Sequence, residues 1–129
     1  MKATDMRTPL GRVRGLGSAK AGTDHFWRQR VTALANTVLG IAGIAIVISL
    51  AGRDYLSAKQ LLSSPLVDAV LLLLIVSAAV HMRIGMQVVI EDYVHEDKTK
   101  FLAVILNTFF AVAIVAVAAI AIFKLSTGA

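Results

Sequence analysis

The sequence has no cysteine and few charged residues, and each shortage excludes a class of protein. Without cysteine the chain can form no disulfide, no thiolate metal site and no thioether-attached haem, so any bound metal must use histidine, carboxylate or methionine ligands. Charged residues make up 16% of the 129 positions, whereas a soluble domain carries about 25%. Apolar residues make up 57%, and the mean hydropathy is +0.77. We therefore expect much of the surface to face lipid.

Acidic residues are also scarce at the start of the chain, where the basic residues gather. Seven of the thirteen Lys and Arg precede Val31, whereas the segment 53–65 is nearly neutral. Because cytoplasmic flanks of membrane spans carry the excess of Lys and Arg, this pattern predicts a cytoplasmic N-terminus and an external C-terminus. The net charge of +5 is explained in this way, and we expect no binding of nucleic acid.

Three apolar stretches are long enough to cross a hydrocarbon core about 30 Å thick, which takes roughly 20 residues. The first and third contain no charge, but the second contains Asp68, His81 and Arg83. The sequence therefore predicts an all-α integral membrane protein with three transmembrane helices. The expected order is a cytoplasmic basic arm (1–30), a first span (31–52), an external loop (53–65), a second span (66–90), a cytoplasmic loop (91–100), a third span (101–123) and an external tail (124–129).

The second span has a clear start. Ser64 and Pro65 are typical of an N-cap and a first helical position, and Asp68 then falls in the first turn, where the helix dipole favours an anion. The first apolar stretch begins too late and runs too long for a signal peptide. We expect a bacterial inner membrane protein, with the mitochondrial inner membrane as the lesser alternative because the arm is rich in arginine and poor in acidic residues.

The residues from His81 to Tyr93 carry the chemistry of the second span. At 100° per residue, His81 and Asp92 share one helix face with Gly85 and Val88 between them, and they lie about 16 Å apart along the axis. If Asp92 lies at the cytoplasmic boundary, His81 lies near the middle of the membrane. A neutral imidazole there suits haem iron, or else it makes a hydrogen bond between helices. Arg83 points about 200° away from His81 around the helix. It could pair with a carboxylate of a partner or with haem propionates.

The chain has two further histidines, His25 and His95. His95 is about 21 Å from His81 along a continued helix, and His25 precedes the first span. Neither is expected to reach an iron atom at His81. A second haem ligand would therefore come from another chain.

The spacing H-x-x-x-G-M-x-x-V-x-x-D-Y, from His81 to Tyr93, resembles the D-type hydrophobic anchor subunit of succinate dehydrogenase (succinate:quinone oxidoreductase, respiratory complex II). A second, weaker match comprises His25, Phe26, Arg30, Thr32 and Ala33. With the basic arm, three spans and acidic loop, the resemblance covers nearly the whole chain.

The resemblance implies a role for each matching residue. His81 would be the axial ligand of one haem b, shared with a companion C-type anchor that supplies the other ligand. Tyr93 would donate a hydrogen bond to a ubiquinone carbonyl, with Asp92 beside it. Arg30 would lie near the haem propionates.

The resemblance also implies partners and limits. A flavoprotein subunit and an iron-sulfur subunit would dock on the cytoplasmic face, so succinate oxidation in the tricarboxylic acid cycle would occur on another chain. No catalytic residue is expected on this one. Read without the family, Tyr93 and Arg30 are ordinary interfacial residues. The alternative function is a small non-redox membrane protein, a transporter or assembly subunit, that uses His81 and Arg83 for packing or proton relay.

Overall fold

The computed structural model describes residues 8–15 and 21–127. Over these ranges the chain is helical and contains no strand, which confirms the predicted all-α class. Lys2, Arg7 and Lys20 of the basic arm lie outside the described residues. The helices are α1 (Pro9–Val13), α2 (Ala21–Leu50), α3 (Tyr55–Leu62), α4 (Pro65–Tyr93) and α5 (Asp97–Thr127).

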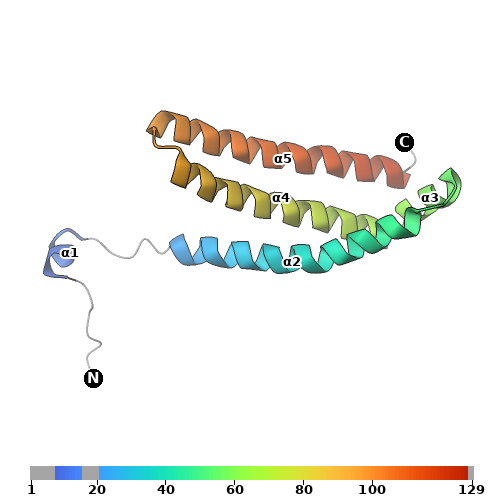
Figure 1. Ribbon diagram of the computed structural model, residues 1–129, viewed down its shortest axis with the longest axis horizontal. Coiled ribbons are helices and arrows are strands. Elements are labelled where there is room, and N and C mark those ends of the chain that lie inside the picture. The colour runs from blue at the N-terminus through green and yellow to red at the C-terminus, as the bar shows by residue number, and fades with distance from the viewer. Residues whose placement is uncertain (1–7, 16–20, 128–129) are drawn as a thin grey trace, which may run out of the picture.

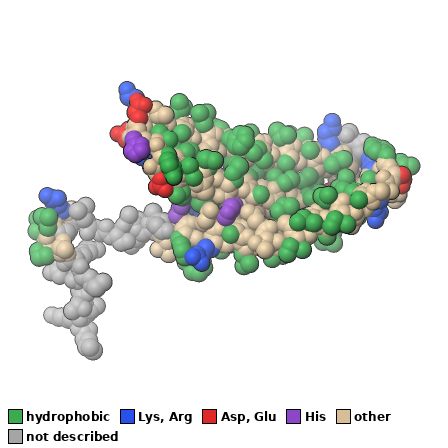
Figure 2. All heavy atoms as spheres, viewed as in Figure 1, with side chains coloured by type: hydrophobic (Ala, Val, Ile, Leu, Met, Phe, Trp, Pro, Cys, Tyr) green, Lys and Arg blue, Asp and Glu red, His purple; other side chains and the backbone are tan. Residues whose placement is uncertain are grey.

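Three of these helices, α2, α4 and α5, are long and apolar enough to cross a membrane. They contain 30, 29 and 31 residues, or about 45 Å each at 1.5 Å per residue. Each helix is thus longer than the hydrocarbon core and extends into the flanking layers. Figure 2 shows hydrophobic side chains along the length of the visible face and charged side chains gathered towards its two ends. The prediction of three membrane-spanning helices is confirmed.

Helix α4 lies between α2 and α5, and the three long helices form a flat layer (Figure 1). α4 packs along both neighbours, whereas α2 and α5 scarcely touch each other. One end of the layer holds the start of α2 and the α4–α5 connection, and we call it the loop end. The other end holds α3, and we call it the α3 end.

The flat arrangement leaves few side chains buried. Among the described residues, the buried side chains lie where α4 meets its neighbours: Ala79, Ile84, Ile90, Asn107 and Ala111. Large apolar side chains on both faces of the layer are exposed, Phe109 and Val117 among them. Such faces suit lipid or the helices of another membrane subunit.

The turn after α2 contains a short helix that the sequence reasoning did not predict. Gly52 ends α2 with a φ of +77°, a left-handed conformation that glycine adopts without a steric penalty. Asp54 then caps α3 by accepting a hydrogen bond from the Ser57 backbone N–H, at 3.3 Å. Hydrogen bonds from Ser57 lower the pKa of the Asp54 carboxyl. The expected external loop therefore contains an ordered helix.

The predicted start of the second span is confirmed. Ser64 is the N-cap of α4, Pro65 occupies its first turn, and Asp68 is the acidic residue of that turn. The Ser64 side chain makes no capping hydrogen bond. The fixed φ of proline and the carboxylate near the helix N-terminus remain as the features that favour a helix start here.

Candidate functional site

A cluster of polar side chains lies inside the α2–α4 interface, towards the loop end. The His81 Nδ1 atom of α4 is 3.0 Å from the Thr32 Oγ1 atom of α2. The His81 Nε2 atom is 3.5 Å from the Gln29 Nε2 atom. Ser77, one turn before His81, donates a longer hydrogen bond of 3.4 Å to the Thr32 carbonyl oxygen. All four side chains are partly buried.

The hydrogen bonds of Thr32 favour one tautomer of His81. The Thr32 hydroxyl lies 2.7 Å from the Arg28 carbonyl oxygen and 3.1 Å from the Gln29 carbonyl oxygen. A carbonyl only accepts, so the single hydroxyl proton is donated to these oxygens. Thr32 Oγ1 is then left as an acceptor, and a proton on His81 Nδ1 satisfies it. In this tautomer Nε2 keeps a lone pair.

Only Gln29 approaches this Nε2 lone pair among the described residues. Its amide nitrogen is a donor, which agrees with an accepting Nε2, but at 3.5 Å the contact is weak. The Gln29 Oε1 atom is buried and has no hydrogen-bond partner in the described part of the chain. A buried amide oxygen without a partner is costly, so the described residues alone leave the site chemically incomplete.

A groove of about 440 Å³ opens beside this cluster, and we call it the loop-end groove. It is lined by His25, Phe26, Gln29 and Arg30 of α2 and by Ile84, Gly85 and Val88 of α4. A side chain at Gly85 would begin 3.6 Å from the Gln29 amide nitrogen, so glycine keeps the groove open at this point. Gly85 and Val88 thus share one wall, as predicted from the helical period.

The packing sets the level of His81 relative to the apolar stretch of α2. Its partners, Gln29 and Thr32, flank Val31, where the first apolar stretch begins. The position of His81 near the middle of the membrane stays a prediction, because it depends on Asp92 marking the boundary. α4 continues about 18 Å past His81 to Tyr93, beyond the level at which the apolar stretch of α2 starts.

Arg30 and His25 both line the loop-end groove. The Arg30 guanidinium carbon lies 4.4 Å from the centre of the Phe26 ring, a cation–π contact that holds the cation on the groove wall. His25 precedes Gln29 by one turn, so it faces Gly85 and Val88 and not His81. The structure gives no contact between the two histidines.

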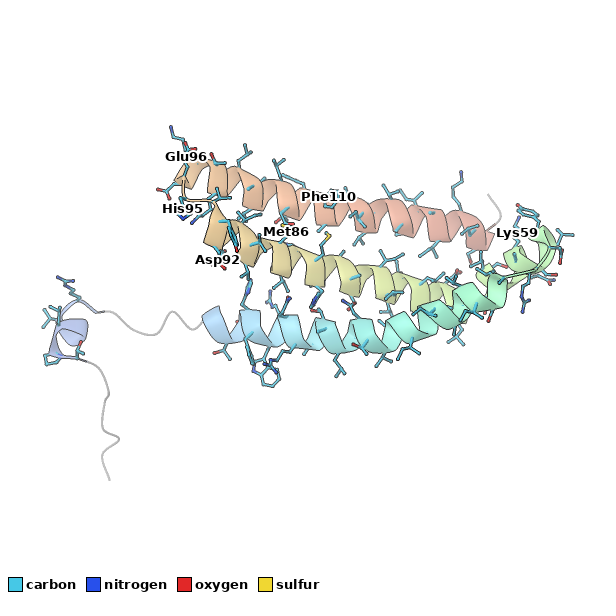
Figure 3. The ribbon with its side chains drawn as sticks, viewed as in Figure 1. Lys59, Met86, Asp92, His95, Glu96 and Phe110 are labelled. Atoms are coloured by element: carbon cyan, nitrogen blue, oxygen red, sulfur yellow. The ribbon has the colours of Figure 1, made fainter. Side chains whose placement is uncertain are left out.

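Asp92 and Tyr93 end α4 and are exposed. In the described part of the chain, their side chains make no hydrogen bond. Figure 3 places Asp92 at the loop end with His95 and Glu96, opposite Lys59. The structure therefore brings Gly85 and Arg30 together around one groove and places His81 in the adjoining polar cluster. Asp92 and Tyr93 lie apart from both, at the end of the layer.

Arg83 lies in the other interface, against α5. Its Nε–H donates to Thr108 Oγ1 at 3.2 Å, and the Asn107 amide donates to the Arg83 carbonyl oxygen at 2.9 Å. His81 thus faces α2 while Arg83 faces α5, as the 200° separation predicts. The described residues hold no group of three or more His, Cys, Asp or Glu side chains able to bind a metal ion alone. A metal at His81 would need further ligands from elsewhere.

Sequence reasoning missed Gln29, Asn107 and Thr108. Gln29 precedes the first apolar stretch by two residues, so its position in the sequence assigns it to the basic arm. Asn107 and Thr108 interrupt an otherwise apolar span that was judged by its lack of charge. An uncharged polar side chain in a membrane helix is itself a signal of an interhelical hydrogen bond, and it would have identified both.

Comparison with known proteins gives one consistent result. The family described as "Succinate dehydrogenase/Fumarate reductase transmembrane subunit" matches residues 4–116. A succinate dehydrogenase hydrophobic membrane anchor subunit from Paracoccus denitrificans is 34% identical over 125 residues, covering 95% of this chain and 94% of the relative. Its counterpart from Rickettsia bellii (strain RML369-C) is 27% identical over 119 residues, covering 92% and 95%. No solved structure gives a significant match.

Proposed function

The chain belongs to the transmembrane-subunit family of succinate dehydrogenase and fumarate reductase, and we propose that His81 is its axial ligand to a haem b. As a membrane anchor of succinate dehydrogenase it works within a complex with other subunits. The proposal extends this role to part of a ubiquinone site at Asp92 and Tyr93. Electrons from succinate would then pass to quinone beside this chain, while the flavin and succinate sites are on other chains.

The observation that carries the haem proposal is the hydrogen bond between Thr32 and His81 Nδ1. Histidines that ligate a metal through one ring nitrogen typically donate the other N–H to a protein oxygen, which fixes the ring and raises the basicity of the ligand. Thr32 supplies such an acceptor, so Nε2 keeps the lone pair that a haem iron requires. The 3.5 Å contact with Gln29 is weak, so little hydrogen-bond energy would be lost if Nε2 bound a metal instead.

The surroundings of His81 fit a haem in chemistry as well as in space. The loop-end groove begins at Gly85, where no side chain blocks a flat group from the backbone, and Ile84 and Val88 give it apolar walls. Arg30, on the opposite wall, supplies a cation for a propionate carboxylate. A bound haem would supply one-electron transfer, and this chain would contribute His81 as an iron ligand and Arg30 as a counter-ion.

Tyr93 and Asp92 are proposed as the contribution of this chain to the quinone site. Both side chains are exposed and have no hydrogen-bond partner in the described part of the chain, so they are available to a molecule that docks at the loop end. The phenol O–H can donate to a quinone carbonyl, and the carboxylate can orient the phenol or accept a proton for delivery to the reduced quinone.

The proposed partners follow from what the site lacks. A second haem ligand would come from a companion C-type anchor, because neither His25 nor His95 reaches His81. That anchor would cover an exposed face of the flat three-helix layer. The flavoprotein and iron-sulfur subunits would dock at the loop end, which brings them next to Tyr93.

We place the loop end on the cytoplasmic side of a bacterial inner membrane. Seven basic residues precede Val31 and the α3 segment is nearly neutral, which is the asymmetry that sets orientation. A topology reporter fused after Ala129 should report a position outside the cytoplasm. A reporter inserted between α4 and α5 should report a position inside the cytoplasm. The reverse pattern would separate Tyr93 from the soluble subunits and contradict the quinone proposal.

The haem proposal is tested by the reduced-minus-oxidised visible spectrum of the purified complex. We expect a low-spin haem b spectrum from the wild type and its loss in His81→Leu, because no other histidine in the described residues contacts this position. Asn107→Leu is the matched control, since it removes a polar side chain from the other interface of α4 and should keep the spectrum. A normal haem content in His81→Leu would show that His81 is a packing residue.

A further inference from the structure

Arg83 carries a charge that no acidic side chain neutralises in the described part of the chain. Only its Nε–H has a partner among the described residues, the Thr108 hydroxyl. This hydroxyl in turn donates a hydrogen bond to the Val104 carbonyl oxygen at 3.0 Å. The two terminal nitrogens of the guanidinium, with four N–H donors, have no hydrogen-bond partner among the described residues, and the side chain is exposed. A cation beside apolar helices is stable only with an anion or water at hand.

The same arginine closes one end of a groove of about 300 Å³ between α4 and α5, which we call the α4–α5 groove. From Arg83 and Thr108 the groove runs towards the α3 end for about 12 Å, the rise from Thr108 to Ala116. Its walls beyond these two residues are Ala and Val side chains, including Ala79 and Ala111. The groove is therefore a narrow apolar channel with one cationic mouth at its loop end.

The cation lies within reach of lipid headgroups. Because α2 and α4 are antiparallel and Thr32 meets His81, Arg83 lies at about the level of Arg30, just before the apolar stretch of α2. Measured along α5, Thr108 lies eight residues, or about 12 Å, beyond Lys100. A long arginine side chain can extend towards the interface while its stem stays in apolar surroundings.

We propose that the α4–α5 groove binds one anionic phospholipid, with its phosphate on Arg83 and an acyl chain along the Ala and Val walls. The planar guanidinium matches two phosphate oxygens, and the direction of the groove matches a lipid whose headgroup is at the loop end. This inference does not depend on haem binding.

The test is a titration of delipidated, purified complex with dioleoyl phosphatidylglycerol or dioleoyl phosphatidylcholine in detergent, with bound lipid counted by native mass spectrometry. We expect the wild type to bind one phosphatidylglycerol at least about fivefold more tightly than phosphatidylcholine. Arg83→Gln should abolish this preference. Arg28→Gln removes an exposed arginine of α2 near the same end and should keep it.

A second pair of variants tests the groove itself. Ala116→Leu fills the far end of the α4–α5 groove and should weaken binding of both lipids, whereas Ala121→Leu, on an exposed part of α5 outside the groove, should not. The proposal is wrong if the wild type shows no preference for phosphatidylglycerol or if Arg83→Gln keeps it. It is also wrong if a carbodiimide joins Arg83→Lys to another subunit, because a helix carboxylate would then occupy the site.

Discussion

The α2–α4 interface holds two grooves of nearly equal volume and opposite chemistry. The loop-end groove has about 440 Å³ and the groove at the α3 end about 450 Å³. The first is lined by histidine, glutamine and arginine as well as apolar side chains. The second is lined only by apolar residues and glycine: Gly40, Gly43, Ile44, Val47, Ile48, Leu71 and Leu74.

The difference shows that volume alone does not identify a site. The α3-end groove is a gap between apolar side chains, and lipid or another helix fills such a gap without any specific contact. The loop-end groove adjoins an oriented imidazole and the Gln29 oxygen, which has no partner among the described residues. Burying a polar group without a hydrogen-bond partner costs free energy, so its presence there indicates a ligand. We therefore expect the two ends to respond differently to matched substitutions.

The largest difference is expected from the two tyrosines, one at each end. Tyr93→Phe should lower quinone reduction by the assembled complex about 2-fold to about 100-fold, since one hydrogen bond is worth about 0.5 to 1.5 kcal/mol and more when a buried partner is left unpaired. Succinate oxidation with a soluble dye and the haem spectrum should stay normal. The measurement is steady-state quinone kinetics over a range of quinone concentrations.

Tyr55→Phe is the matched control, because Tyr55 is 77% exposed and Tyr93 is 78% exposed. Both substitutions remove one hydroxyl and keep an aromatic ring at the membrane surface. Equal kinetics in the two variants would make Tyr93 an ordinary interfacial residue and place the quinone on other subunits.

A smaller difference is expected from two threonines of α2. Thr32→Val removes the acceptor of the His81 Nδ1–H and keeps the shape of the side chain. Haem should stay bound, but a less basic ligand raises the midpoint potential, by about 20 to 60 mV if the lost hydrogen bond is worth 0.5 to 1.5 kcal/mol. A spectroscopic redox titration of the purified complex measures this shift.

Thr37→Val provides the comparison within the same helix. The Thr37 hydroxyl bonds only the Ala33 carbonyl oxygen of its own helix, at 3.0 Å, so its loss should leave the potential unchanged. The same potential for wild type and Thr32→Val would mean that Thr32 does not orient the haem ligand.

Most of the fold could be predicted from the sequence, since apolar runs of about 20 residues leave few alternatives. The start of α4 could also be predicted, because Ser64 and Pro65 mark a helix start without reference to the rest of the fold, and the structure confirms it. Helix α3 could not be predicted in this way, because its eight residues are too few for a clear period and a cap residue such as Asp54 is equally common in loops.

The site was predictable only in part. The helical period correctly placed Gly85 and Val88 on one face and Arg83 on another, because both are properties of a single helix. The depth of His81 and its contacts with Gln29 and Thr32 depend on how α2 and α4 slide against each other. No local pattern sets that register, so it required the packed structure.

The smallest effect is expected from two glycines of the α3-end groove, and it tests whether that end is packing alone. A Cβ added at Gly43 would lie 2.8 Å from the Leu74 Cδ2 atom, whereas one at Gly40 would meet nothing within 4 Å. Alanine is favoured over glycine in a helix by about 1 kcal/mol. Because the added methyl group at Gly40 meets no neighbour, Gly40→Ala should raise the thermal stability of the complex slightly. Gly43→Ala has the same helix-propensity advantage, but the new methyl group must displace the end of the Leu74 side chain, which costs about 1 kcal/mol or more. We therefore expect no increase in thermal stability from Gly43→Ala. Both variants should keep normal haem spectra and quinone kinetics, because neither residue lies in the loop-end groove. A changed spectrum in Gly43→Ala with normal stability would mean that the α3 end takes part in the site, and the contrast between the two grooves would then fail.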